Sequence, residues 1–169
     1  LPPRSQSGPE TLAEYRARGG YQGLQRWRNS GTATQFLAEI AASGLRGRGG
    51  ASFPTARKWQ LAAAATATEK FVVANGGEHE PGGQKDRHLV LHHPHAGLEG
   101  LLLAGLATGA TKGWLYLIED MAGPRAAAEQ ALRELQDAGL MTFPLQIHCG
   151  PTTYVAGEET AALNAIEGL

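Results

Sequence analysis

The stretch KFVVAN, residues 70–75, followed at once by two glycines, decides the fold class. Its β-branched and apolar residues indicate a buried strand, and the glycine pair indicates a turn that ends it. Two later runs have the same character, GWLYLIE at 113–119 and PLQIHCG at 144–150. Helical patterns separate the three runs, and this alternation predicts an α/β domain with a mostly parallel sheet flanked by helices.

The helices are predicted from apolar spacing and from the residues that cap or end helices. Residues 10–28 predict one or two short helices that break at Gly19-Gly20. Residues 32–43 predict another helix, capped by Thr34 and ended by Gly44. The remaining predicted helices lie at 56–68, 84–93, 97–110, 124–138 and 158–167.

Composition excludes several classes of protein. Hydrophobic residues make up 42% of the 169 residues and charged residues 18%, which is typical of a globular domain. The formal net charge of -1 argues against a nucleic-acid binder, which usually carries a basic excess. The single cysteine, Cys149, excludes a disulfide framework and a four-thiolate zinc or iron–sulfur site within this sequence.

Membrane and metal functions are not expected either. The most apolar run, LEGLLLAGLATGA at 98–110, contains Glu99 and is shorter than the roughly 20 residues of a membrane span. Residues 1–9 lack the apolar core of a secretory signal, so we expect a disordered tail there. The histidines in HHPH, residues 92–95, match no standard ligand spacing, and no metal site is predicted.

Chemistry in a parallel sheet is expected beyond the carboxyl ends of the strands. The segments there are NGGEHEPG at 75–82, EDMAGP at 119–124 and GPTTYVAGEE at 150–159. The first carries Glu78 and Glu80, whose carboxylates can accept hydrogen bonds from a ligand or can sit in a solvated turn. The acids of the third begin a helix, where the helix dipole alone is a sufficient explanation for them.

A glycine-rich loop stands in the stretch GLRGRGGASFPTARKW, residues 44–59. Its glycines free the backbone N–H groups, which form anion-binding concavities, and Arg48 and Lys58 add positive charge. The loop follows a helix and not a strand, so it fails the context test for a dinucleotide-binding fingerprint. Spacing alone leaves a phosphate site and a structural turn both open.

Four motifs in order resemble the FMN-binding part of the NADH-oxidising 51 kDa subunit of respiratory complex I and the related diaphorase subunits of hydrogenases and formate dehydrogenases. The motifs are GLRGRGGASFPTARKW at 44–59, NGGEHEPGGQKDR at 75–87, PHAGLEGLLLAG at 94–105 and YVAGEETAALNAIEG at 154–168. The resemblance runs from about Thr11 to the last residue. Several long motifs in the same order make it far more specific than any single glycine pattern.

The resemblance implies a Rossmann-like domain in which FMN takes electrons from NADH and passes them singly to iron–sulfur clusters. Four residues would surround the FMN phosphate and ribityl chain: Gly47, Arg48, Gly49 and Lys58. Three would line the isoalloxazine and nicotinamide region, with Glu80 as the catalytic residue: Asn75, Glu78 and Glu80. Four would form the far wall: Tyr154, Gly157, Glu158 and Glu159. Phe53 would stack on NADH.

The chain also departs from the family pattern. Ser52 and Ala56 stand where glycines are expected, and Gly77 stands where the family has an acid. Three more departures fall near the third strand: Pro151, Thr152 and Ala156. These changes keep a second interpretation open, in which the chain is a non-catalytic homologue that acts as a structural or assembly subunit of a respiratory complex. In a third interpretation, the chain is a flavin or nucleotide carrier.

The resemblance also implies domains and partners. We expect a tail at 1–9, N-terminal helices at 10–43 and an FMN- and NADH-binding α/β domain at 44–169, truncated relative to the family. The family continues into a ubiquitin-like domain and a cluster-binding helical domain, so no iron–sulfur cluster is expected in this chain. The expected partners are iron–sulfur subunits of an NADH dehydrogenase, hydrogenase or formate dehydrogenase. The expected location is cytoplasmic, peripheral to a membrane-bound complex, with an organelle matrix as the alternative.

Overall fold

A three-stranded parallel sheet forms the centre of the computed structural model, which describes residues 8–48, 51–78, 82–153 and 158–168. The strands are β1 (Phe71–Asn75), β2 (Lys112–Ile118) and β3 (Leu145–Gly150), in the order β1-β2-β3. Both strand pairs are parallel, which confirms the predicted α/β class. Because β2 pairs on both sides, the sheet has β1 and β3 as its edges.

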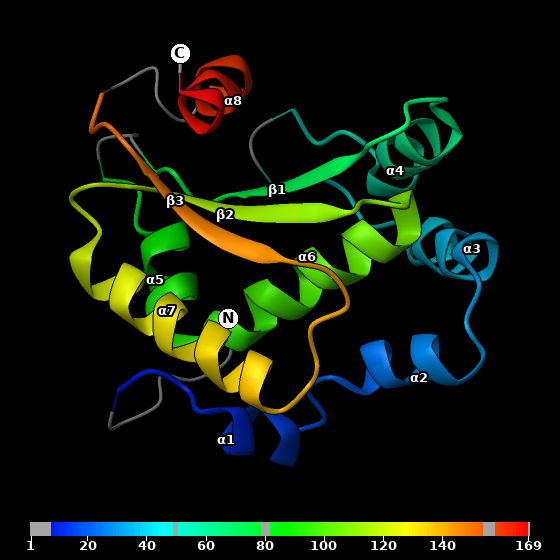
Figure 1. The fold of residues 1–169 in the computed structure, drawn as a ribbon, viewed down its shortest axis with the longest axis horizontal. Coiled ribbons are helices and arrows are strands. Elements are labelled where there is room, and N and C mark those ends of the chain that lie inside the picture. The colour runs from blue at the N-terminus through cyan, green and yellow to red at the C-terminus, as the bar shows by residue number, and fades with distance from the viewer. Residues whose placement is uncertain (1–7, 49–50, 79–81, 154–157, 169) are drawn as a thin grey trace.

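Helices cover the two faces of the sheet unequally (Figure 1). Three of them lie below the sheet in this view: α5 (Lys85–His92), α6 (Pro94–Thr108) and α7 (Ala122–Asp137). On the upper side, α8 (Glu159–Glu167) lies over the carboxyl-terminal part of β3. Pro94 occupies the first turn of α6, where its missing N–H leaves no unmet hydrogen bond.

Four helices precede the sheet: α1 (Leu12–Ala17), α2 (Gln22–Ser30), α3 (Ala33–Ser43) and α4 (Thr55–Ala64). The predicted break between α1 and α2 is confirmed. The predicted cap Thr34 is wrong, because Thr32 has the extended backbone of a cap and its hydroxyl accepts the N–H of Gln35. Gly44 ends α3 with φ of 65°, as predicted.

The first strand differs from its prediction as a buried strand. Phe71 is 55% exposed, and the three middle residues of β1 are only partly covered. The reason is topological, since β1 lies at the edge of the sheet and pairs with β2 alone. In contrast, Leu115, Tyr116, Leu117 and Ile118 of the central strand are all buried.

Two apolar clusters hold the layers together. The lower cluster joins α1 and α2 to α6, α7 and the sheet, with Leu24, Leu102 and Leu135 fully buried in it. The second cluster packs β2 against Ala128 of α7 and Ala162 of α8. No helix within the described ranges is long and apolar enough to cross a membrane.

Candidate functional site

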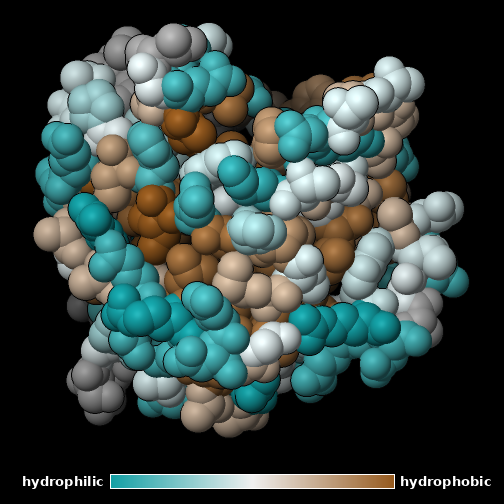
Figure 2. Space-filling view, in the orientation of Figure 1, coloured by the Kyte–Doolittle hydropathy of each residue, from teal (hydrophilic) through white to brown (hydrophobic). Residues whose placement is uncertain are grey.

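Two of the predicted site residues form a contact between α4 and α8. Lys58 on α4 and Glu159 on α8 form an ion pair, with 3.4 Å between Nζ and Oε1. Their side chains remain 65% and 76% exposed, so the pair is weak and Lys58 stays accessible to an anion. Figure 2 shows an indentation of the surface between the parts that cover α8 and α4.

The glycine-rich loop folds as a hairpin that enters α4. Arg46 and Pro54 form an antiparallel bridge, the N–H of Gly47 donates to the Phe53 carbonyl at 2.8 Å, and the N–H of Thr55 donates to the Leu45 carbonyl at 3.0 Å. The hairpin carries Phe53 outward, with 49% of this residue exposed. The described part of the loop therefore presents an aromatic ring at the start of α4.

Gly47 is not required by the packing of the chain itself. A Cβ added there would meet only backbone atoms of Phe53, at 3.6 and 3.8 Å, which is ordinary contact. The space beside Gly47, together with exposed Arg48 and accessible Lys58, fits the close approach of an anionic nucleotide. The structure describes four of the residues predicted to contact FMN or NADH in this stretch: Gly47, Arg48, Phe53 and Lys58. The fifth, Gly49, lies outside the described residues.

Ser52 adopts a backbone conformation that favours glycine. Its φ is 50°, in the left-handed region, at the position where the resemblance predicts a glycine. The Nε of Arg46 donates to the Ser52 carbonyl at 2.8 Å and to the Ser52 hydroxyl at 3.2 Å, which holds the strained residue in place. The other replaced glycine, Ala56, is buried in the first turn of α4.

The loop after β1 is organised by its own polar side chains. The N–H of Gly77 donates to Oδ1 of Asn75 at 3.1 Å, which closes a local turn. Glu78 is 8% exposed, and its two oxygens accept the N–H groups of Lys85, Asp86 and Arg87 at 2.9, 3.2 and 3.2 Å. Glu78 therefore caps α5 from seven residues upstream, while Glu80 lies outside the described residues.

An ion pair joins the same region to the end of β2. Both carboxylate oxygens of Asp120 lie 2.7 Å from Nη2 of Arg87. Nη1 of Arg87 also donates to the Asp120 backbone carbonyl at 3.3 Å, so the guanidinium holds Asp120 through two of its nitrogens. The ion pair holds the start of α5, and with it the Glu78 cap, against the carboxyl-terminal edge of the sheet.

The last motif begins at α8. Glu158 is the N-cap, and one of its oxygens accepts the N–H groups of Thr160 and Ala161 at 3.0 and 3.1 Å. These backbone hydrogen bonds hold the pKa of the Glu158 carboxyl below its ordinary value. Tyr154 and Gly157 lie outside the described residues, as does Ala156, and Pro151 and Thr152 are exposed.

Two histidines of HHPH contact acidic side chains of the protein. His93 lies 3.4 Å from a Glu10 oxygen, and His95 lies between Tyr21 and Glu134. Within the ranges that the structure describes, no three histidine, cysteine or acidic side chains converge to hold a metal ion.

Sequence reasoning missed the buried polar contacts of Tyr15, Tyr21, His95 and Glu99. Tyr15 and Tyr21 look like apolar points of short helices, yet the hydroxyl of Tyr15 donates to Glu99 at 2.6 Å. One available signal was the spacing of His95 and Glu99, four residues apart on an otherwise apolar helix. Side chains so placed share a face, and a buried carboxylate needs donors.

Comparison with known proteins points to one family. The family model of the "Nuo51 FMN-binding domain" matches residues 40–169. The chain is 35% identical over 166 residues to an NADH-quinone oxidoreductase subunit of Rhizobium meliloti, covering 93% of this chain and 39% of that protein. It is 40% identical over 144 residues to the mitochondrial NADH dehydrogenase [ubiquinone] flavoprotein 1 of Dictyostelium discoideum, covering 79% of this chain and 30% of that protein.

A solved structure is also similar. The NAD+-reducing [NiFe]-hydrogenase in its air-oxidized state contains a chain that matches with a TM-score of 0.70 and 33% identity. The match covers 86% of this chain and 27% of that one. The chain thus spans about two-fifths or less of the length of these relatives.

Proposed function

The chain belongs to the Nuo51 FMN-binding domain family, and on this premise we propose that it binds FMN and serves in the oxidation of NADH. The observation that carries the proposal is the meeting of Lys58 and Glu159, which come from two separate motifs assigned to one flavin site. The hairpin at Gly47 and Phe53 stands in the same motif as Lys58. Because the relatives are much longer, the complete reaction is proposed for a larger assembly.

The residues of the site bind and orient the cofactor. Arg48 and Lys58 supply positive charge for the FMN phosphate, and the hairpin backbone approaches the ribityl chain at Gly47. The exposed ring of Phe53 offers a stacking surface to NADH. Bound FMN supplies the exchange between a two-electron donor and one-electron acceptors. We assign Gly49, Glu80, Tyr154 and Gly157 to the same site on the motif match alone.

The assembly follows from the same family membership. The proposed acceptors are iron–sulfur clusters held by partner subunits of an NADH dehydrogenase, a hydrogenase or a formate dehydrogenase, with none in this chain. The proposed location is the cytoplasmic side, peripheral to a membrane-bound complex, with an organelle matrix as the alternative. The similarity to a subunit of an NADH-quinone oxidoreductase and to a chain of an NAD+-reducing hydrogenase supports a place in a multi-subunit oxidoreductase.

Three features favour a second candidate, a non-catalytic homologue that keeps the fold in a structural or assembly role. Ser52 places a side chain in a strained turn where the family pattern has glycine, beside the proposed phosphate site. Gly77 also removes an acid, and both oxygens of the neighbouring Glu78 are occupied by α5. The absent acid at Gly77 and the occupied oxygens of Glu78 reduce the polar groups that remain for a flavin ring.

The test separates the candidates. The chain is purified with its partners, titrated with FMN by fluorescence quenching, and then mixed with NADH under anaerobic conditions while visible absorbance is recorded. FMN uptake followed by bleaching of the flavin bands supports the proposal. FMN uptake without bleaching indicates a flavin carrier, and no uptake at all indicates the non-catalytic homologue. FMN with NADH but without protein is the control.

A further inference from the structure

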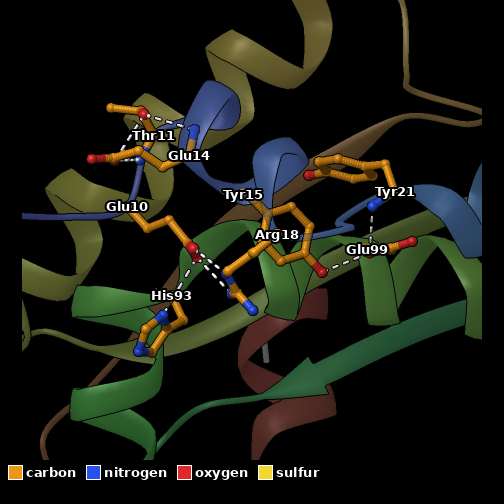
Figure 3. Close-up of polar contacts among 8 residues, drawn as sticks. All are labelled: Glu10, Thr11, Glu14, Tyr15, Arg18, Tyr21, His93 and Glu99. Atoms are coloured by element: carbon orange, nitrogen blue, oxygen red, sulfur yellow. Dashed lines mark hydrogen bonds and ion pairs between the residues drawn. The ribbon is translucent and has the colours of Figure 1, made fainter. Parts of the chain in front are cut away.

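Glu99 anchors the N-terminal helices to α6. This carboxylate is 8% exposed on a mostly apolar helix. One of its oxygens accepts the Tyr15 hydroxyl at 2.6 Å and the N–H of Tyr21 at 2.9 Å (Figure 3). The other oxygen accepts the N–H of Leu24 at 3.4 Å. A buried charge with three donors is well satisfied, so these contacts attach α1 and α2 to the sheet domain.

His95, one turn before Glu99, makes a second attachment from a fully buried position. Its Nδ1 lies 3.0 Å from the Tyr21 hydroxyl, and its Nε2 lies 3.1 Å from Oε2 of Glu134 on α7. The ionised Glu134 carboxylate only accepts, so Nε2 carries the proton. Nδ1 is then an acceptor, and the Tyr21 hydroxyl donates to it. The neutral imidazole therefore matches both partners.

A third group of contacts holds the start of the segment. Glu10 forms a paired set of hydrogen bonds with the Arg18 guanidinium, and its Oε2 lies 3.4 Å from Nδ1 of His93 (Figure 3). The N–H of Glu10 donates to the His92 carbonyl at 3.1 Å. Although burial acts to raise it, the pKa of the Glu10 carboxyl is lowered by its hydrogen bonds from Arg18 and His93. The segment thus reaches the corner between α5 and α6.

We propose that residues 10–30 form a pH-sensitive strap, which the neutral His95 imidazole holds on α6 and α7 and which loosens when that imidazole is protonated. Protonation places a hydrogen on both ring nitrogens, so the Tyr21 hydroxyl must change from donating to Nδ1 to accepting from it. The acceptor then left for the hydroxyl proton is the His95 carbonyl, at the long distance of 3.5 Å. Protonation also places a charge where the ring is 0% exposed, which favours an opened state that hydrates the imidazolium. The proposal does not depend on flavin binding, because none of these contacts involves a proposed flavin residue.

The groups around His95 set the direction of the effect. Tyr15 of α1 stacks on the ring at 5.9 Å, Glu99 lies on the same helix, and the charges of Glu10, Arg16 and Glu134 also act on it. Burial lowers the pKa of His95 below its ordinary value of 6.5, although the Glu134 carboxylate acts in the opposite direction. Opening releases a group that binds a proton more readily, so the strap is held above pH 6.5 and loosens as the pH falls below it.

Hydrogen–deuterium exchange of the whole chain tests the strap. We expect protection of peptides from residues 10–30 to fall roughly tenfold between about pH 7.5 and about pH 5.5, after correction for intrinsic exchange rates. Peptides from β2 and α7 are the internal reference. In His95→Asn, the side-chain oxygen can still accept from Tyr21 but does not titrate, so its protection should not change with pH. His148→Asn, at a histidine of β3 that makes none of the strap contacts described above, is the matched control and should keep the change.

Two results would overturn the proposal: equal protection of the strap at both pH values, or a pH effect that persists in His95→Asn. If that variant does not fold, an NMR titration of the His95 ring in the unmodified chain decides. The strap requires this ring to titrate below the ordinary histidine value. Titration at or above that value contradicts the proposal.

Discussion

Nζ of Lys58 lies 3.4 Å from Oε1 of Glu159, although 101 residues separate them in the sequence. Lys58 stands on the helix that precedes β1, and Glu159 begins the helix that follows β3. Because the three strands between them are parallel, the chain crosses back to the same end of the sheet before each strand begins. The two residues are thus brought together by the topology, and their exposure leaves both available to a ligand.

The first prediction concerns Lys58→Ala. If Lys58 faces the FMN phosphate, FMN affinity should fall about tenfold or more, since a charge-assisted hydrogen bond contributes about 1.5–3 kcal/mol. FMN fluorescence quenching measures the change. Arg57→Ala, which removes the adjacent exposed cation, is the matched control and should have a much smaller effect. Unchanged affinity in Lys58→Ala would refute its assignment to the phosphate.

The second prediction concerns the strained residue of the hairpin. Ser52→Gly should raise the free energy of unfolding by about 1 kcal/mol, because φ of 50° is costly for a residue with a side chain. The substitution gives up the Arg46 contact to the hydroxyl but keeps the one to the carbonyl. Ser52→Ala loses the same hydroxyl without relieving the backbone, so it should not stabilise. Denaturant unfolding compares the two, and equal effects would contradict a backbone cause.

The third prediction concerns the cap of α5. Glu78→Ala leaves the N–H groups of Lys85, Asp86 and Arg87 without this acceptor and should lower the free energy of unfolding by about 1–3 kcal/mol. Glu78→Gln retains a carbonyl acceptor, so its free energy of unfolding should lie between that of the unmodified chain and that of Glu78→Ala. Glu119→Ala, at an exposed acid just past β2, is the control. A loss no larger than that of the control would mean that the cap is dispensable.

The fourth prediction is loss of stability at high pH. Burial raises the pKa of Tyr15 and Tyr21 well above the ordinary value of 10.0, and the hydrogen bond to Glu99 raises that of Tyr15 further. The folded chain keeps protons that the unfolded chain releases, so stability is present below pH 10.0 and is lost as the pH rises above it. Unfolding at a series of alkaline pH values should show this decline, with a smaller slope in Tyr15→Phe.

Much of the fold could be predicted because glycine and proline mark the ends of its elements. The strand at 71–75 ends before Gly76-Gly77, and α5 ends before Pro94, as the helix predicted at 84–93 does. In contrast, α6 begins at Pro94 and not at the predicted residue 97. The exposure of β1 could not be predicted, because strand order is a property of the whole sheet. The cap of α3 was missed for a local reason, since Thr32 and Thr34 both suit a cap and only the backbone conformation separates them.

The candidate site was less predictable than the fold. The resemblance assigns Glu78 and Glu158 to a ligand site, and in the structure both also accept backbone N–H groups at helix starts. A sequence motif gives the identity of a residue, but it does not give the donors whose hydrogen bonds the side-chain oxygens accept. The same limit hid the role of Glu99, whose donors come from residues more than 70 positions earlier in the sequence.

The attachment at Glu99 has a practical consequence for defining the autonomous folding unit. The family model begins at residue 40, whereas the donors to Glu99 come from Tyr15, Tyr21 and Leu24. A chain trimmed to the family boundary would leave a bare carboxylate facing apolar side chains, and breaking such contacts from one side typically costs several kcal/mol. Expression work on this domain should therefore start no later than Glu10.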